Sequence, residues 1–128
     1  MRKVIAVLMI IVAFLCSCSN AKEVKASNMA VSVGKQAIQL IDDYLDGRKN
    51  AHDVQQELMA LHEKMSYTSD YVGTEMTAEQ RDDWSISNAI LSAEANIGFY
   101  EYDSNPENYN TIIERRNNLA DLVGIEKR

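Results

Sequence analysis

The sequence is poor in the residues that cross-link small exported domains or interrupt helices. It holds two cysteines, one proline and five glycines among 128 residues. Both cysteines, Cys16 and Cys18, lie at the end of an N-terminal apolar segment. The remainder of the chain therefore has no cysteine for a disulfide, a catalytic thiolate or a cysteine metal site. We expect an apolar core alone to hold the domain together.

Basic residues are also scarce. The chain has 13 Lys and Arg residues against 19 Asp and Glu, a net charge of −6, and its pI is about 4.8. No stripe of basic residues is present to neutralise phosphates, which argues against nucleic acid as a partner. The same balance argues against electrostatic adhesion to anionic lipid.

A long apolar run is absent as well. Arg2 and Lys3 precede Val4–Leu15, which is twelve residues without a charged or polar side chain. A transmembrane helix needs about 20 apolar residues. A positive end, a short apolar stretch and small residues before a polar chain are the layout of a signal peptide. We expect residues 1–17 to be removed on export.

The residues Leu15-Cys16-Ser17-Cys18 resemble the lipobox of bacterial lipoproteins. In that family an aliphatic residue and two small residues precede the cysteine that is acylated and becomes the new N-terminus. Cys16 departs slightly, because Ala, Ser or Thr is commoner there. The resemblance implies a lipid anchor on Cys18, with acyl chains such as palmitate. The alternative is an ordinary secretory signal cut after Ala21.

The mature chain would run from Cys18 to Arg128. Loss of Arg2 and Lys3 leaves 11 basic residues against 19 acidic ones, a net charge of −8. Residues 18–28 are small and polar and predict a short tether, and residues 29–128 have the length of one domain. We expect the protein in the bacterial cell envelope, held by its lipid on the outer face of the membrane.

Helical periodicity dominates the mature chain. Apolar residues recur at three- and four-residue spacing in four segments, with almost no strand signal. The segments run from about 28 to 46, from 50 to the region 71–73, from 77 onward, and from 105 to about 124. Cap residues precede the last three, namely Asn50, Thr77 with Gln80, and Asn105 with Pro106. This pattern predicts an all-α domain, a small antiparallel bundle of two helical hairpins.

Each segment has an apolar stripe that we expect to face the core. In the third, Ile86, Ile90, Ala93 and Ile97 make one face, and Trp84 and Leu91 are expected to widen it. The other stripes are Ala30, Val33, Ala37, Leu40, Ile41 and Tyr44; Val54, Leu58, Leu61 and Met65; and Tyr109, Ile112, Arg116, Leu119 and Val123.

One acidic stretch resembles a calcium loop. From Asp42 to Asp53 it places Asp at positions 1, 5 and 12 and Gly at 6, as in EF-hands, and its ending resembles dockerin loops. Tyr44 at position 3 and Lys49 at position 8 depart from the pattern, and dockerins need two copies. The alternative is a helix, a stop at Gly47, a cap at Asn50 and the next helix.

No other motif predicts a metal or catalytic site. His52 and His62 lie about 15 Å apart along one helix and lack partners at metal-ligand spacing. Ser85, Ser87 and Ser92 stand outside any nucleophile motif. The six tyrosines, which we expect near helix ends and gathered at one end of the bundle, indicate either a binding patch or seals at the end of the core. They are Tyr44, Tyr67, Tyr71, Tyr100, Tyr102 and Tyr109.

These observations favour a binding or interaction module tethered to the membrane, with an envelope protein as the expected class of partner. An exposed aromatic or apolar patch would mark such a module. A carrier of a small ligand or of calcium is the alternative, and it predicts a cavity between the hairpins. We expect no cofactor and no enzymatic activity, since no nucleophile and no paired acid and base are indicated.

Overall fold

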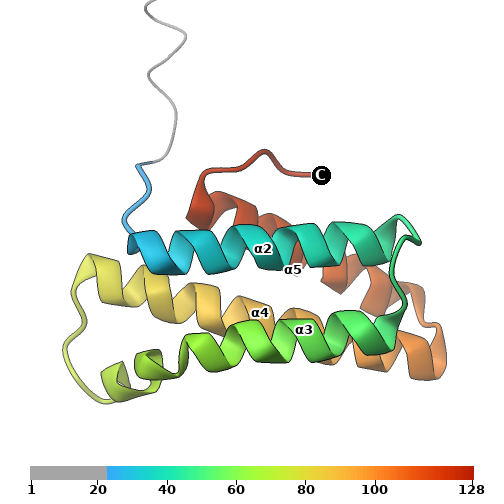
Figure 1. Cartoon of the computed structure of the whole chain (residues 1–128), viewed down its shortest axis with the longest axis horizontal. Helices are drawn as coiled ribbons and strands as arrows, with labels where there is room; N and C mark the ends of the chain where they lie inside the picture. Colours follow the sequence, from blue (N-terminus) through green and yellow to red (C-terminus); the bar gives the residue numbers. More distant parts are fainter. Residues whose placement is uncertain (1–22) are drawn as a thin grey trace, which may run out of the picture.

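The computed structural model describes residues 23–128, which form a bundle of four antiparallel α-helices (Figure 1). The elements are α2 (Asn28–Leu45), α3 (Ala51–Lys64), the short 3-10 helix η1 (Ser66–Tyr71), α4 (Ala78–Asp103) and α5 (Pro106–Val123). The predicted all-α fold, a small helical bundle, is confirmed.

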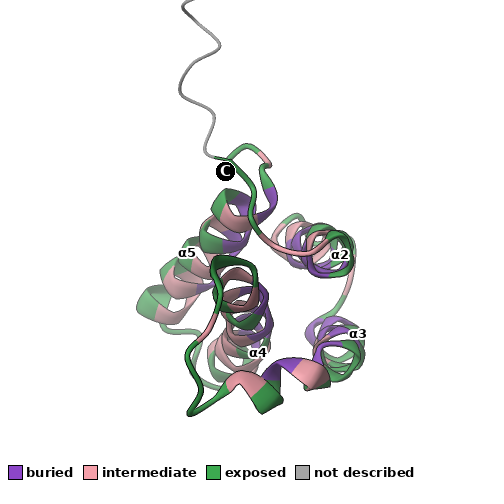
Figure 2. Cartoon of the chain, turned by 90° about the vertical axis from the view of Figure 1, so that its left-hand side faces the viewer, coloured by how far each residue is buried: buried purple, intermediate pink, exposed green. Residues whose placement is uncertain are grey.

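The helices are arranged so that α2 and α4 lie at the centre. Viewed along the bundle, α3 and α5 stand on opposite sides of this pair (Figure 2). Helix α2 contacts α3, α4 and α5, and α4 contacts the three others, whereas α3 and α5, among the described helices, do not touch. The α4 helix therefore has α3 and α5 beside it as well as α2, and η1 also packs against it. Its remaining side is exposed to solvent at Trp84, Leu91, Phe99 and Tyr102.

The core is built from the stripes that the periodicity predicts. Helices form here because apolar residues spaced three and four apart face one direction, and burying that side stabilises them. The most deeply buried large side chains come from all four helices: Ile41, Leu58, Met65, Ile86, Ile90, Ile97, Ile112, Leu119 and Val54.

Local signals set the helix ends. The Asn50 side chain accepts from the Asp53 amide at 2.9 Å, and Thr77 and Gln80 form a reciprocal capping box. Gly47 and Gly124 follow α2 and α5 in the left-handed region, with φ of +71° and +72°. Glycine adopts this conformation without steric cost, so both helices stop there.

The second helix ends earlier than predicted. Its apolar period suggested a helix continuing to residues 71–73, but α3 stops at Lys64 and η1 follows. The Thr68 hydroxyl donates to the Met65 carbonyl at 2.8 Å, and the Ser69 hydroxyl donates to the Ser66 carbonyl at 2.7 Å. These local bonds compete with the α-helical ones and tighten the chain into a 3-10 turn.

Candidate functional site

Cys18, the predicted lipidation site, lies outside the described residues, as does the signal segment. Ser27, the N-cap of α2, ties the start of the described chain to the bundle by hydrogen bonds. Its amide donates to Asp83 Oδ1 and its hydroxyl donates to Asp83 Oδ2, both at 2.8 Å. The Tyr67 hydroxyl donates to the same Oδ2 at 3.0 Å. We call Ser27, Tyr67 and Asp83 the tether clamp.

The tether clamp is polar, with a buried carboxylate at its centre and two half-buried donors around it. Asp83 is 2% exposed and receives three hydrogen bonds, which offsets the cost of removing a carboxylate from water. Burial raises the pKa of Tyr67 to about 12, and its hydrogen bond to Asp83 acts in the same direction. The clamp joins the start of α2 to η1 and α4. It holds the point at which residues 23–26 enter the bundle.

The stretch from Asp42 to Asp53 forms a helix end and a turn rather than a calcium loop. Helix α2 continues through Leu45, so Asp42 and Asp43 lie on helical backbone. Arg116 reaches Asp42 from α5 with two parallel bonds, Nε to Oδ1 at 3.0 Å and Nη2 to Oδ2 at 2.9 Å. This bidentate pair occupies the first carboxylate of the calcium-like pattern.

The next two carboxylates of the stretch are also paired with arginines. Asp43 accepts from Arg48 at 2.8 Å, and Asp46 is bound by Arg48 and by Arg128. The pKa of Asp43 is lowered, first by its hydrogen bond from Arg48, and the pKa of Asp46 is lowered, first by its bond from Arg128. Residues 23–128 contain no group of three or more His, Cys, Asp or Glu side chains placed to hold a metal.

The structure brings His62 to Ser87, a pairing that sequence spacing did not indicate. Nδ1 of His62 lies 3.1 Å from the Ser87 hydroxyl and 3.3 Å from the Ser87 carbonyl oxygen. Ser87 is 2% exposed, so its hydroxyl faces the inside of the bundle. The contact joins α3 to α4. His52 is exposed and lies about 15 Å away along α3.

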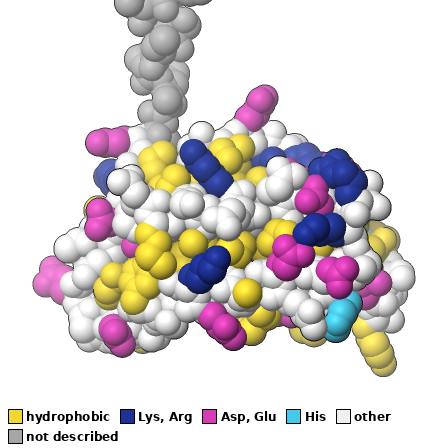
Figure 3. All heavy atoms as spheres, in the orientation of Figure 1, with side chains coloured by type: hydrophobic (Ala, Val, Ile, Leu, Met, Phe, Trp, Pro, Cys, Tyr) yellow, Lys and Arg dark blue, Asp and Glu magenta, His cyan; other side chains and the backbone are white. Residues whose placement is uncertain are grey.

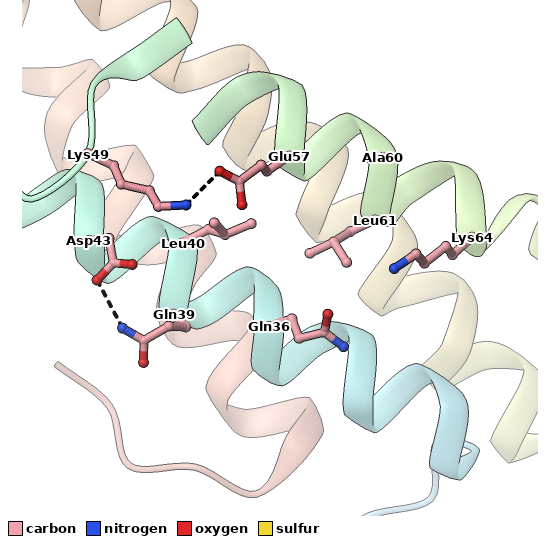
Figure 4. Close-up of a pocket in the computed structure, with 9 residues that line it drawn as sticks. All are labelled: Gln36, Gln39, Leu40, Asp43, Lys49, Glu57, Ala60, Leu61 and Lys64. Carbon is pink, nitrogen blue, oxygen red and sulfur yellow. Dashed lines mark hydrogen bonds and ion pairs between the residues drawn. The ribbon is translucent and has the colours of Figure 1, made fainter. Parts of the chain in front are cut away.

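A shallow groove of about 430 Å³ runs between α2 and α3. Figure 3 shows a band of hydrophobic side chains along the line where these two helices meet. Leu40 and Leu61, which are 8% and 5% exposed, form the floor (Figure 4). The polar lining consists of Gln36, Gln39, Asp43, Lys49, Glu57 and Lys64.

Charges differ between the two ends of this groove. At one end Lys49 pairs with Glu57 at 2.5 Å, which closes the gap between the α2–α3 turn and α3. At the other end Lys64 extends into the groove from α3, with Gln36 on the α2 side (Figure 4). Lys64 takes part in no ion pair within residues 23–128. An anionic group over the apolar floor would find a cation there.

The second surface feature is on α4. Trp84, Leu91, Phe99 and Tyr102 are 37%, 39%, 59% and 93% exposed, and we call these four residues the α4 outer face. The prediction that Trp84 and Leu91 widen the core stripe is therefore wrong. The inner side of α4 already fills its space with Ile86, Ile90, Ala93 and Ile97, so the helix is apolar on two sides.

The tyrosines lie at both ends of the bundle rather than one. Tyr67 and Tyr71 pack edge to face near η1, with ring centroids 6.0 Å apart. Tyr100 and Tyr109 pack 5.3 Å apart at the other end. Near them Tyr44 donates to Glu101 at 2.8 Å, and burial together with this bond raises its pKa. Most of these rings seal the core, whereas Tyr102 stands free in solvent.

No protein-family model, no curated protein and no solved structure matches the chain. Within residues 23–128, no helix is both long enough and apolar enough to cross a bilayer. The function must therefore be inferred from the surfaces of the bundle.

Proposed function

We propose that this protein is a lipid-anchored, extracytoplasmic binding module that presents a helical interaction surface at the membrane. The signal segment and the lipobox resemblance support the location, and the α4 outer face supports the binding role. Three of its four side chains are aromatic, and aromatic residues contribute most of the energy in many protein interfaces.

The observation that carries the proposal is the exposure of Phe99 and Tyr102. Both lie near the C-terminal end of α4, at 59% and 93% exposure, on a helix whose opposite side is packed. Large apolar side chains exposed close together are unfavourable in water unless something covers them. Serine or lysine at these positions would keep the bundle soluble without altering its core. A partner surface is the function that these side chains support best.

The anchor is tested at its own residue. Cys18→Ala should move the protein from the membrane fraction to the soluble fraction, because the acylated thiol is lost. Cys16→Ala is the matched control, since that residue leaves with the signal segment and the variant should stay on the membrane. Mass spectrometry of the mature N-terminus should show an acylated Cys18. A mature chain that starts at an unmodified Lys22 would contradict the anchor.

The binding role is tested by crosslinking in the living cell. A photoreactive amino acid at position 99 should yield a covalent protein adduct, because the α4 outer face is expected to be covered. The same amino acid at position 35, an exposed position of α2, is the control and should yield none. Absence of any adduct at position 99 at native expression would contradict the binding role.

A second candidate function, a carrier of a small ligand, rests on the groove between α2 and α3. Its apolar floor and Lys64, which makes no ion pair in the described part of the chain, suit a small molecule with an aliphatic part and an anionic group. Native mass spectrometry of protein purified from its own membrane should then show a retained mass. Ala60→Phe should fill the groove and remove that mass, whereas Gln56→Phe, exposed and outside the groove, should keep it. A bare protein mass in both variants and in the parent would exclude the carrier.

A further inference from the structure

The residues of the α4 outer face are spaced so that they form one line along the helix, as residues do where two helices pair. We call this line the seam. At 100° per residue, Leu91 lies about 20° from Trp84 after two turns, and Tyr102 returns to the direction of Trp84 after five turns. Ala95 lies about 20° from Trp84 in the direction opposite to Leu91, and Phe99 lies about 60° from Trp84 on the same side as Ala95. One line of uncharged side chains, about 27 Å long, therefore follows the open side of α4.

The residues between these large side chains are small or neutral. Asn88, Ala95 and Gly98 are half-buried, and Gly98 is covered by the Gln55 side chain, whose Nε2 lies 2.7 Å from where a Cβ would stand. Large side chains therefore stand at the two ends of the seam, with Leu91 and a small residue near its middle. Such a profile complements its own reverse, since an end with a ring meets another end with a ring and Leu91 meets the small side chain of Ala95.

We propose that the α4 outer face binds the same face of a second copy of this chain, with the two α4 helices antiparallel. This inference deepens the proposed binding function and rests on it, because it names the partner of that surface. A two-fold axis at the level of Ala93 places Trp84 of one copy opposite Tyr102 of its partner, nine residues on either side. It also places Leu91 opposite Ala95 of the second copy.

The charges at the ends of the seam favour the antiparallel direction. Arg81 lies one turn before Trp84 and makes no ion pair within the described chain, and Asp103 follows Tyr102. Measured along the axis from Ala93, these two residues are about 18 Å and about 15 Å away, in opposite directions. In an antiparallel pair each Arg81 comes near an Asp103 of the other copy. A parallel pair would bring the two Arg81 side chains together.

The exposed area indicates a weak dimer that membrane attachment would strengthen. Taking about 200 Å² for a whole aromatic side chain, the three rings expose roughly 400 Å² per copy. Two copies would then bury roughly 800 Å² from aromatics, below the usual size of a stable interface of about 1,200 Å² or more. Lipid anchors confine both copies to one surface and raise their effective concentration. The full chain in its own membrane is therefore the right material for a test.

Engineered disulfides test both the partner and the direction. Cys18 is expected to be acylated, so an introduced cysteine would be the one free thiol of the mature chain. Under mild oxidation in the membrane, Ala95→Cys should form a disulfide-linked dimer, because the two positions lie beside the two-fold axis. Differently tagged Trp84→Cys and Tyr102→Cys chains, expressed together, should crosslink to each other. Lys35→Cys on α2 is the matched control, and we expect about tenfold less dimer from it.

The outcomes separate this inference from the binding function. A Tyr102→Cys chain that crosslinks with itself as efficiently as Ala95→Cys would overturn the antiparallel pairing. If Ala95→Cys forms no dimer while the photoreactive residue at position 99 captures a different protein, the second copy is excluded and the binding function stands. If neither probe reacts, both proposals fail. Melting curves of each variant, unchanged from the parent, establish that the substitutions left the fold intact.

Discussion

At the scale of single residues, two buried charged side chains connect distant parts of the chain. Asp83 accepts hydrogen bonds from Ser27 and Tyr67. Arg116, which is 7% exposed, donates two hydrogen bonds to Asp42. Arg116 also donates to the carbonyl of Glu126 at 2.6 Å, which fastens the C-terminal tail. Buried polar groups are costly unless their partners are present, so each network favours one arrangement of the helices.

The tether clamp makes a direct prediction. Asp83→Asn removes the charged acceptor, so the bonds from Ser27 and Tyr67 lose their charge assistance and their hydroxyl groups must turn to accept from the new amide nitrogen; the free energy of unfolding should fall by about 1–3 kcal/mol. Urea denaturation followed by circular dichroism measures the change. Asp82→Asn is the matched control, since Asp82 is only half-buried and its side chain makes no hydrogen bond within residues 23–128. Equal effects from the two substitutions would contradict the role given to Asp83.

Sequence patterns anticipate little at this scale. The helical stripe of α5 correctly includes Arg116, but nothing in its spacing names Asp42, which is 74 residues away. The contact of His62 with Ser87 is likewise absent from any motif, because it depends on how α3 packs against α4. The calcium-like spacing of Asp42 to Asp53 shows the converse. Its carboxylates have the right order in sequence, yet three of them pair with arginines, one from within the stretch (Arg48) and two from the C-terminal part of the chain (Arg116 and Arg128).

At the scale of helices, local chemistry predicts most boundaries. The caps Asn50, Thr77 and Asn105 stand where the sequence places them, since a cap depends only on residues within one turn. The predicted end of α3 was wrong because the apolar period of the sequence continues to Met65 and beyond. Side-chain bonds from Thr68 and Ser69 outweigh that period over a few residues.

Two helical glycines differ in what surrounds them. A Cβ on Gly34 of α2 would lie 2.6 Å from Val123 Cγ1, whereas a Cβ on Gly98 of α4 would meet only the flexible end of Gln55. Gly34→Ala should destabilise the protein by about 1–3 kcal/mol, because α2 and α5 must separate. Gly98→Ala should leave stability unchanged or raise it by up to about 1 kcal/mol through helix propensity. Chemical denaturation of both variants checks the difference, and a gain for Gly34→Ala would contradict the close approach.

The turn between α2 and α3 predicts a pH dependence. Arg48 and Arg128 lower the pKa values of Asp43 and Asp46 below the ordinary value of 3.8. The unfolded chain therefore takes up these protons at higher pH than the folded chain does. Their contribution to stability is present above about pH 4 and is lost as the pH falls through the lowered pKa values.

Melting temperatures measured from about pH 7 down to about pH 3 test this dependence. Asp46→Asn should lose part of the acid-side decrease, since one of the titrating groups is gone. Asp70→Asn serves as the control, because Asp70 is exposed and pairs with no cation in the described chain. Identical pH profiles for the two variants would argue against the pairing of Asp46.

At the scale of the whole molecule, the pairing of acidic and basic groups predicts its response to calcium. Asp42, Asp43 and Asp46 are held by arginines, so an ion would have to displace those pairs and unwind the end of α2. We expect the melting temperature to be the same in millimolar calcium and in EDTA. A sample with magnesium at the same concentration controls for the general effect of ionic strength. A calcium-specific rise would restore the loop interpretation.

The sequence by itself determined the helical class, most helix limits and most residues of the core, whereas processing at Cys18 stays a prediction from the sequence. Periodicity and caps act over one or two turns, so they can be read without knowing the fold. Only the tertiary structure decided which side of α4 is covered. The apolar pattern of α4 continues around the helix, and the inner side becomes core because α2, α3 and α5 pack there. Trp84, Leu91, Phe99 and Tyr102 lie on the side of α4 opposite Ala93 and stay exposed there, and that side is where we expect a second copy to bind.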